Sequence, residues 1–285
     1  MNRLLPLLLL FSLTSGAVFG DTNPRSTPAV PKTLAALQTQ TGKQFFVAQR
    51  GALLIAADLP RQQFDYVVNG IVACCQKALE REFFTTRLTQ PVTIYIFQNK
   101  ESYARGLKKF FLLDPISPYG HYGHRQRYIV INYQTGPGTL VHELTHALMA
   151  ADFPDAPIWI SEGMASLYEQ CRVEDEGLLG EANWRLPELQ KALSDGKTVP
   201  LEKLFGSDAQ NFRLMDESLH YAQSRYFCLY LQEIGKLRAV YQTFRDNVTY
   251  DRFGVKSVEM VLQKTLPEIE RDWLEWVARQ RWSKK

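Results

Sequence analysis

The residues best suited to chemistry in this chain lie in the run His142-Glu143-Leu144-Thr145-His146. On an α-helix, residues four apart share one face, so His142 and His146 can offer imidazole nitrogens to one zinc ion (Zn²⁺). Glu143 is one residue, ~100°, around the helix, which places its carboxylate beside a water on the metal rather than on the metal itself. The spacing therefore predicts a zinc site with an adjacent general base.

A glutamate on the next predicted helix can complete this site. The His-Glu-x-x-His run alone leaves open an ordinary helix with two coincidental histidines, a match expected on the order of once in 200 such chains. Residues 151–156 indicate a short loop, after which residues 159–165 read Trp-Ile-Ser-Glu-Gly-Met-Ala. If this second helix folds back along the first, Glu162 becomes a third ligand and leaves the fourth position open to water. Gly163 then allows close backbone packing.

These motifs resemble those of the gluzincin zinc peptidases of the peptidase MA-like clan, in particular an exported bacterial branch. The shared features are a strand at residues 127–132, His-Glu-x-x-His at 142–146, Trp-x-x-Glu-Gly-x-Ala at 159–165 and Tyr-Ala-Gln-Ser at 221–224. The resemblance covers roughly the latter half of the mature chain. It implies metal-assisted hydrolysis of peptide bonds in a peptide or protein substrate, with Glu143 as general base. It also implies that residues 127–132 form the edge strand with which an extended peptide pairs.

One position departs from the better-known gluzincins. Several of them place an aspartate four residues after the ligand glutamate, where it orients a zinc-bound histidine, but this chain has Ser166. Other groups must therefore orient His142 and His146.

A donor for the oxygen that becomes negative during hydrolysis is expected on the helix that begins near residue 219. Tyr221 and His220 can each supply one, and the resemblance favours Tyr221. Adjacent helix positions point ~100° apart, so the two side chains are not expected to face the same oxygen. Packing in the core is the remaining role for both.

A different class of function is a non-catalytic exported binding module that keeps the same scaffold, since fold does not fix function. The presence of Glu143 argues against it, because a site that only binds metal has no need of a base.

The order of predicted elements indicates an α+β, zincin-like fold. A hairpin, two further strands and two helices are predicted before residue 132, and helices follow one another after Gly136-Pro137-Gly138 without a convincing strand. We therefore expect one domain over residues 44–285. It comprises a small mixed-sheet lobe with the active-site helix, residues 44–150, and a mainly helical lobe, residues 151–285.

The N-terminal residues predict export to the periplasm or the cell exterior. Residues 1–20 combine Arg3, an apolar run and a small-residue boundary, which is the layout of a secretory signal peptide. Residues 21–43 read as an extended leader, and no later segment is apolar and long enough to cross a membrane. The formal net charge of +3 makes nucleic acid an unexpected partner.

Two further groups of residues could be mistaken for functional clusters. Cys74, Cys75, Cys171 and Cys228 form either one or two disulfides or buried free thiols. His121 and His124 have no acidic or thiol partner close in sequence, so residues 119–124 are predicted to be a Gly- and Tyr-rich loop rather than a second metal pair.

Overall fold

A mixed five-stranded sheet forms the first half of the chain. The computed structural model describes residues 28–115, 117–174, 177–214 and 216–283. The sheet has the order β1-β2-β3-β5-β4, in which β2, β3 and β5 run parallel while β1 and β4 pair antiparallel at the two edges. The strands are β1 (Phe46–Arg50), β2 (Leu53–Ala57), β3 (Val92–Phe97), β4 (Gly120–Gly123) and β5 (Tyr128–Asn132).

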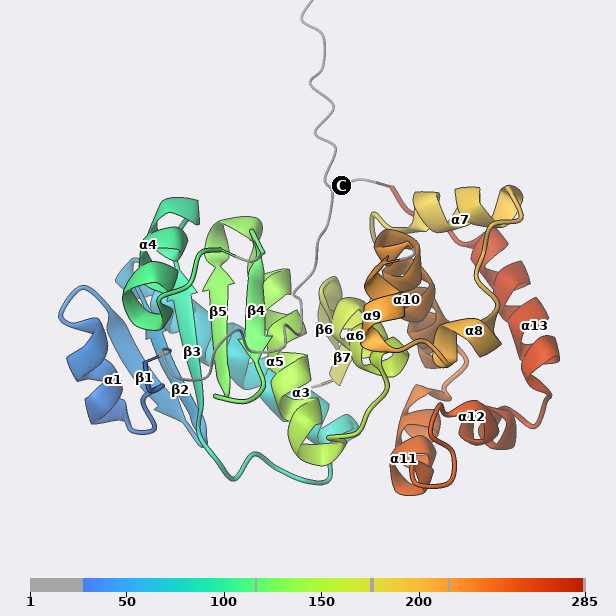
Figure 1. Cartoon of the computed structure of the whole chain (residues 1–285), viewed down its shortest axis with the longest axis horizontal. Helices are drawn as coiled ribbons and strands as arrows, with labels where there is room; N and C mark the ends of the chain where they lie inside the picture. Colours follow the sequence, from blue (N-terminus) through green and yellow to red (C-terminus); the bar gives the residue numbers. More distant parts are fainter. Residues whose placement is uncertain (1–27, 116, 175–176, 215, 284–285) are drawn as a thin grey trace, which may run out of the picture.

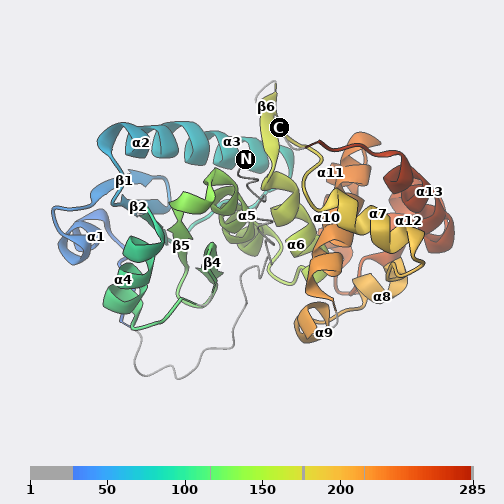
Figure 2. The same cartoon turned by 90° about the horizontal axis from the view of Figure 1, so that it is seen from above.

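Helices cover both faces of this sheet (Figure 2). Because side chains alternate along a strand, Leu53 and Ile55 of β2 join one core while Leu54 and Ala56 join the other. The second core is closed by α1 (Leu34–Thr41) and α4 (Lys100–Phe111). The first core is closed by α2 (Arg61–Tyr66), the π-helical turn η1 (Val67–Val72), α3 (Ala73–Glu82) and α5 (Pro137–Asp152). Burial on both faces explains the nearly continuous apolar composition of β2 and β3.

The second half of the chain is mostly helical and lies on the side of α5 that faces away from the five-stranded sheet (Figure 1). Its central element is α10 (Glu217–Glu233), which is buried from Leu219 to Leu231 and contacts α6 (Ile158–Tyr168) along its length. Around it lie α7 (Leu186–Ser194), α8 (Leu201–Phe205), α9 (Ala209–Leu214), α11 (Leu237–Asn247), α12 (Val255–Leu262) and α13 (Leu266–Arg279). The sequence-based prediction of a mixed sheet followed by a mainly helical part is confirmed, as is the capping box of Thr265 and Glu268 that begins α13.

A buried carboxylate joins the C-terminal end of α5 to both halves. Asp152 accepts hydrogen bonds from the Thr85 and Thr86 backbone N–H groups, at 2.8 and 2.6 Å, and from the Tyr241 hydroxyl at 3.0 Å. It also lies 2.9 Å from Arg245 Nη1. Burial alone would raise the pKa of Asp152, but these donors lower it below its ordinary value. The end of α5 is thereby held between the segment after α3 and helix α11.

Apart from strand β4, two predictions about secondary structure were wrong. The stretch 21–43, expected to be an extended leader, contains helix α1, because Thr33 Oγ1 accepts from the Ala36 N–H as an N-cap and Leu37 packs into the second core. A hairpin of β6 (Cys171–Glu174) and β7 (Gly177–Gly180) follows α6, where no strand was predicted. Its four-residue strands are too short to show an alternating pattern, and Gln232 holds it by bonding both the N–H and the carbonyl of Gly180.

The predicted signal peptide, residues 1–20, lies outside the described residues. In the part of the chain that is described, no helix has both the length and the apolar character that crossing a bilayer requires. All four cysteines carry free thiols; Cys75 and Cys228 are buried, Cys171 is half-buried and Cys74 is exposed.

Candidate metal centre

Helix α5 carries the His-Glu-x-x-His run into the interior. It begins after Gly136, whose φ of 99° favours glycine, and has Pro137 in its first turn. From Leu140 to Met149 each residue is buried, because the sheet lies on one side of the helix and α6 lies on the other. His142, Glu143 and His146 are therefore positioned by a rigid element that is enclosed on several sides.

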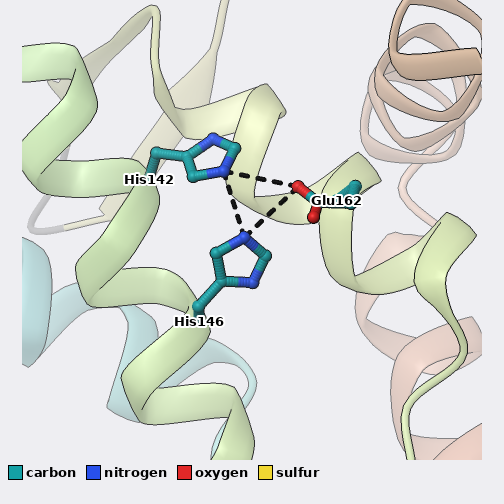
Figure 3. Close-up of side chains that lie close together, drawn as sticks. All are labelled: His142, His146 and Glu162. Carbon is teal, nitrogen blue, oxygen red and sulfur yellow. Dashed lines mark hydrogen bonds and ion pairs between the residues drawn. The ribbon is translucent and has the colours of Figure 1, made fainter. Parts of the chain in front are cut away.

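The structure brings His142, His146 and Glu162 together (Figure 3). The Nε2 atoms of the two histidines are 3.0 Å apart, and Glu162 Oε2 lies 3.4 Å from His142 Nε2 and 3.3 Å from His146 Nε2. All three side chains are buried, and apart from the two imidazoles Glu162 Oε2 has no hydrogen-bond donor among the described residues. A buried carboxylate oxygen that faces two imidazole nitrogens is the arrangement expected where a metal ion binds.

Helix α6 is anchored so that Glu162 faces α5. Trp159, three residues earlier, stacks on Phe205 with ring centroids 4.0 Å apart, and its Nε1 donates to the Phe253 carbonyl at 2.9 Å. Gly163 lies against α10, where an added Cβ would come within 2.8 Å of both Cys228 Sγ and the Ser224 carbonyl oxygen. The close backbone packing predicted for Gly163 is thus observed, and it is α10 that approaches.

The sequence did not identify the groups that orient the two histidines. Glu169 Oε1 lies 2.9 Å from His142 Nδ1, and Glu169 is itself paired with the buried Arg185 at 3.0 Å. Ser161 Oγ lies 3.1 Å from His146 Nδ1. Glu169 follows Glu162 by seven residues, about two helical turns, so it projects on the same side of α6. The sequence feature that could have predicted this contact was a second acidic residue seven positions after Glu162. Glu169 makes the contact to His142 that Ser166 does not make.

A buried cation stabilises the C-terminal end of α6, next to Glu169. Arg225 of α10 donates to the Ser166 and Leu167 carbonyl oxygens at 2.9 and 3.4 Å, and to the carbonyl of Glu181. Carbonyl groups in the last turn of a helix have no N–H partner within the helix itself, so Arg225 supplies donors to them. A positive charge at this end of a helix is also favourable. Burial lowers the pKa of Arg225 to about 10, and the guanidinium remains charged at neutral pH.

Charges at the cluster are strongly coupled. Burial opposes protonation of His142, yet the neighbouring Glu162 and Glu169 carboxylates raise its pKa to about 10. Burial would raise the pKa of Glu162, but His146 and His142 lower it far below its usual value. Burial raises the pKa of Glu143, against the opposing effect of His142 and His146. Glu162 is therefore an ionised carboxylate that can bind a metal. The carboxyl group of Glu143 binds a proton more tightly than usual.

Two cavities adjoin the cluster. The first, of about 600 Å³, is lined by His142 and Glu143 and extends past Gly120 and the start of α5. The second, of about 800 Å³, is lined by His146 and Glu162 and extends past His124 and the segment after α5. Both α5 and β4 therefore run from the first cavity towards the second, with the cluster between the cavities.

The strand that borders these cavities was assigned wrongly from the sequence. Residues 127–132 were expected to be the edge strand, but β5 is an inner strand, and the edge is β4, formed by part of the predicted loop at residues 119–124. The glycines that suggested a loop allow close pairing instead. A Cβ on Gly120 would lie 2.5 Å from the Val130 carbonyl oxygen, and one on Gly123 would lie 2.3 Å from the Tyr128 ring.

Tyr221 and His220 lie on α10, which packs against α6. Both are buried, and Tyr221 packs edge-on against Phe212 with its ring 5.7 Å from the Arg185 guanidinium carbon. Neither residue is part of the lining of the two cavities. His220 Nδ1 lies 2.7 Å from the Phe212 carbonyl oxygen, which can only accept, so the Nδ1–H donates to this carbonyl and is already engaged.

The other two histidines of the region have separate environments. His121 Nε2 lies 3.1 Å from the Tyr128 hydroxyl, and burial lowers the His121 pKa to about 4. His124 stands closer to the cluster, with its ring centroid 6.5 Å from that of His146, and burial lowers its pKa to about 4 as well. Over the described ranges, His142, His146 and Glu162 form the one group of three potential ligands.

No protein-family model and no curated protein matches this chain. The assignment of function therefore depends on the geometry of the site.

Proposed function

We propose that the protein is a zinc-dependent peptidase of gluzincin type with a zincin-like fold. The observation that carries this proposal is the buried group of two Nε2 atoms and one carboxylate oxygen, separated by 3.0 to 3.4 Å. Zinc bound tetrahedrally at ~2.0–2.1 Å would separate its ligand atoms by ~3.3 Å, so the three atoms need little movement to bind it. Three protein ligands, two histidines and one glutamate, match the donor set of a catalytic rather than a structural zinc site.

Glu143 is the proposed general base. When bound, zinc supplies a Lewis acid that lowers the pKa of a water and polarises the scissile carbonyl. Glu143 lies next to His142 in the wall of the first cavity, where its carboxylate can take the proton of the attacking water and pass it to the leaving amine.

The position of β4 at the edge of the sheet formed by the described residues supports a peptide as the substrate. Asn132 N–H donates to the Tyr119 carbonyl oxygen, so in the antiparallel register residues 119, 121 and 123 face β5. The backbone polar groups of Gly120 and Tyr122 point away from β5, and Gly120 borders the first cavity. An extended peptide that paired with these groups would pass from one cavity to the other, across the metal ligands.

Tyr221 remains the proposed donor to the developing oxyanion, and the bond from His220 Nδ1 to the Phe212 carbonyl favours it over the histidine. Because Tyr221 does not line either cavity, its hydroxyl must reach the substrate after a change of side-chain position on binding. The proposed compartment is the periplasm or the cell exterior, on the layout of residues 1–20.

The test is cleavage of a peptide library by the zinc-loaded native chain and by Glu143→Gln. The native chain should hydrolyse peptides, while the variant should keep zinc and fold and lose nearly all turnover, because the amide cannot act as a base. Equal turnover in the two proteins would remove Glu143 from the mechanism. Zinc binding without hydrolysis in either protein would favour the non-catalytic binding module.

A further inference from the structure

A polar groove lies along the outer edge of the five-stranded sheet, at β1. It has a volume of about 650 Å³ and is lined by β1 on one side and by the helical segment of α2, η1 and α3 on the other. β1 is the last strand in the sheet order, so the described strands pair with only one of its edges. Polar residues one or two helical turns apart line the helical side: Arg61, Asp65, Asn69 and Gln76.

The groove is separate from the metal centre. Tyr66, Gly70 and Cys74 of the same helical segment line the first cavity instead. A ligand in the groove would therefore lie across this helical segment from His142 and Glu143. Such a ligand can bind whether or not the protein is a peptidase.

Arg50 is a half-buried cation in this groove that lacks a negatively charged partner. Its Nη2 donates to the amide oxygen of Asn69, and its buried Nε has no hydrogen-bond partner among the described residues. Asp65 is the one carboxylate in the described lining of the groove, and it is paired with Arg61 at 2.8 Å. A cation that is partly removed from water is stabilised by an anion, so Arg50 can bind a carboxylate from a ligand.

The backbone of β1 can hold an extended peptide next to this cation. Arg50 and Leu53 are the last pair before the two-residue turn of the β1–β2 hairpin, and the pair that closes such a turn is hydrogen-bonded. By alternation, Val47 and Gln49 direct their backbone N–H and carbonyl groups away from β2. A strand that pairs with these groups directs every second side chain to the face of the sheet on which Arg50 meets Asn69.

We propose that this groove binds an extended acidic peptide segment, which adds a strand to β1 and places a carboxylate against Arg50. Main-chain hydrogen bonds to β1 supply affinity that depends little on the sequence of the peptide. The guanidinium selects the acidic side chain, because it can hold both oxygens of a carboxylate. The groove is thus a second binding site, outside the metal centre.

The experiment measures the fluorescence anisotropy of labelled, end-capped heptapeptides of alternating Val and Thr whose central residue is Glu, Gln or Lys. The zinc-loaded full chain carries Glu143→Gln, so that any peptidase activity does not consume the probes. The Glu peptide should bind ~10-fold or more tightly than the Gln peptide, and the Lys peptide should bind most weakly.

Asn69→Asp tests the role of Arg50 without a change of side-chain size. It places a carboxylate where Arg50 now meets an amide, so the cation gains a partner within the chain and the preference for the Glu peptide should disappear. The matched control is Gln62→Glu, which adds the same charge at an exposed position of α2 outside the groove. At ~0.15 M salt this control should keep the native preference, because distant charges are screened.

Methylation of alternate backbone nitrogens in the Glu peptide tests the added strand. It removes the donors that pair with β1, so one of the two alternate sets of methyl groups should abolish binding. Native affinity with both sets, equal binding of the three peptides, or an unchanged preference in Asn69→Asp would each overturn the inference. None of these measurements depends on hydrolysis, so this site and the proposed peptidase can fail separately.

Discussion

Glu169 should contribute to metal affinity although it is not a ligand. Its Oε1 lies 2.9 Å from His142 Nδ1, on the side of the ring opposite the metal-facing Nε2, and Arg185 holds it from behind. Although burial opposes it, Arg185 and His142 lower the pKa of Glu169, so it is a carboxylate at neutral pH. This carboxylate fixes the tautomer and the direction of His142 and increases the basicity of Nε2.

Glu169→Ala should therefore weaken zinc binding by ~10- to 100-fold, which corresponds to about 1.4 to 2.8 kcal/mol. The substitution also leaves Arg185 buried without its partner, and that loss would lower stability separately. The double variant Glu169→Gln with Arg185→Met removes both charges together, so it isolates the effect on His142 from the cost of an unpaired cation.

The assay is competition for zinc with a chelator of known affinity, on chains whose folding is checked by circular dichroism. The control is Ser166→Ala, at the position where better-known gluzincins have the orienting aspartate. Ser166 is buried and its hydroxyl has no partner among the described residues, so zinc affinity should be unchanged. Native affinity in both Glu169 variants would refute the reasoning, as would a large loss in Ser166→Ala.

Three further substitutions test other parts of the structure. Gly163→Ala should lower thermal stability and zinc affinity, because overpacking of ~1–3 kcal/mol against the Ser224 backbone exceeds the ~1 kcal/mol that alanine gains in a helix; a native melting temperature would contradict this. Asp152→Asn should cost about 2 to 4 kcal/mol at pH 7. Because the folded pKa of Asp152 is lowered, its contribution is complete above the ordinary carboxyl pKa and is lost as the pH falls through the folded value. Denaturant unfolding from pH 7 to pH 2 should therefore show the variant and the native chain converging in acid, and a constant difference would count against the role. Tyr221→Phe should keep zinc and fold while lowering kcat by ~10²-fold with little change in substrate binding; native kcat would return Tyr221 to a packing role.

The ligands were accessible from sequence because their geometry is local. His142 and His146 share a helix face by spacing alone, and Glu162 follows after a loop short enough to bring the second helix back. Strands β1, β2, β3 and β5 and most helices were also accessible, since their apolar patterns reflect burial in the core.

Contacts between segments far apart in the chain could not be predicted from the sequence in this way. Arg185 and Arg225 meet the end of α6 from other parts of the chain, and no periodic pattern announces a buried arginine. Strand β4 was mistaken for a loop because Gly120 and Gly123 have low strand propensity. Only the pairing of β4 with β5 shows why a side chain larger than that of glycine does not fit at these two positions.

The most direct measurement of the central claim is zinc K-edge X-ray absorption of the purified chain together with its zinc content. The account predicts one zinc per chain, two imidazole nitrogens and one carboxylate oxygen at ~2.0–2.2 Å, and loss of the bound metal in His146→Ala. Sulfur ligands at ~2.3 Å, or full zinc occupancy in His146→Ala, would contradict it.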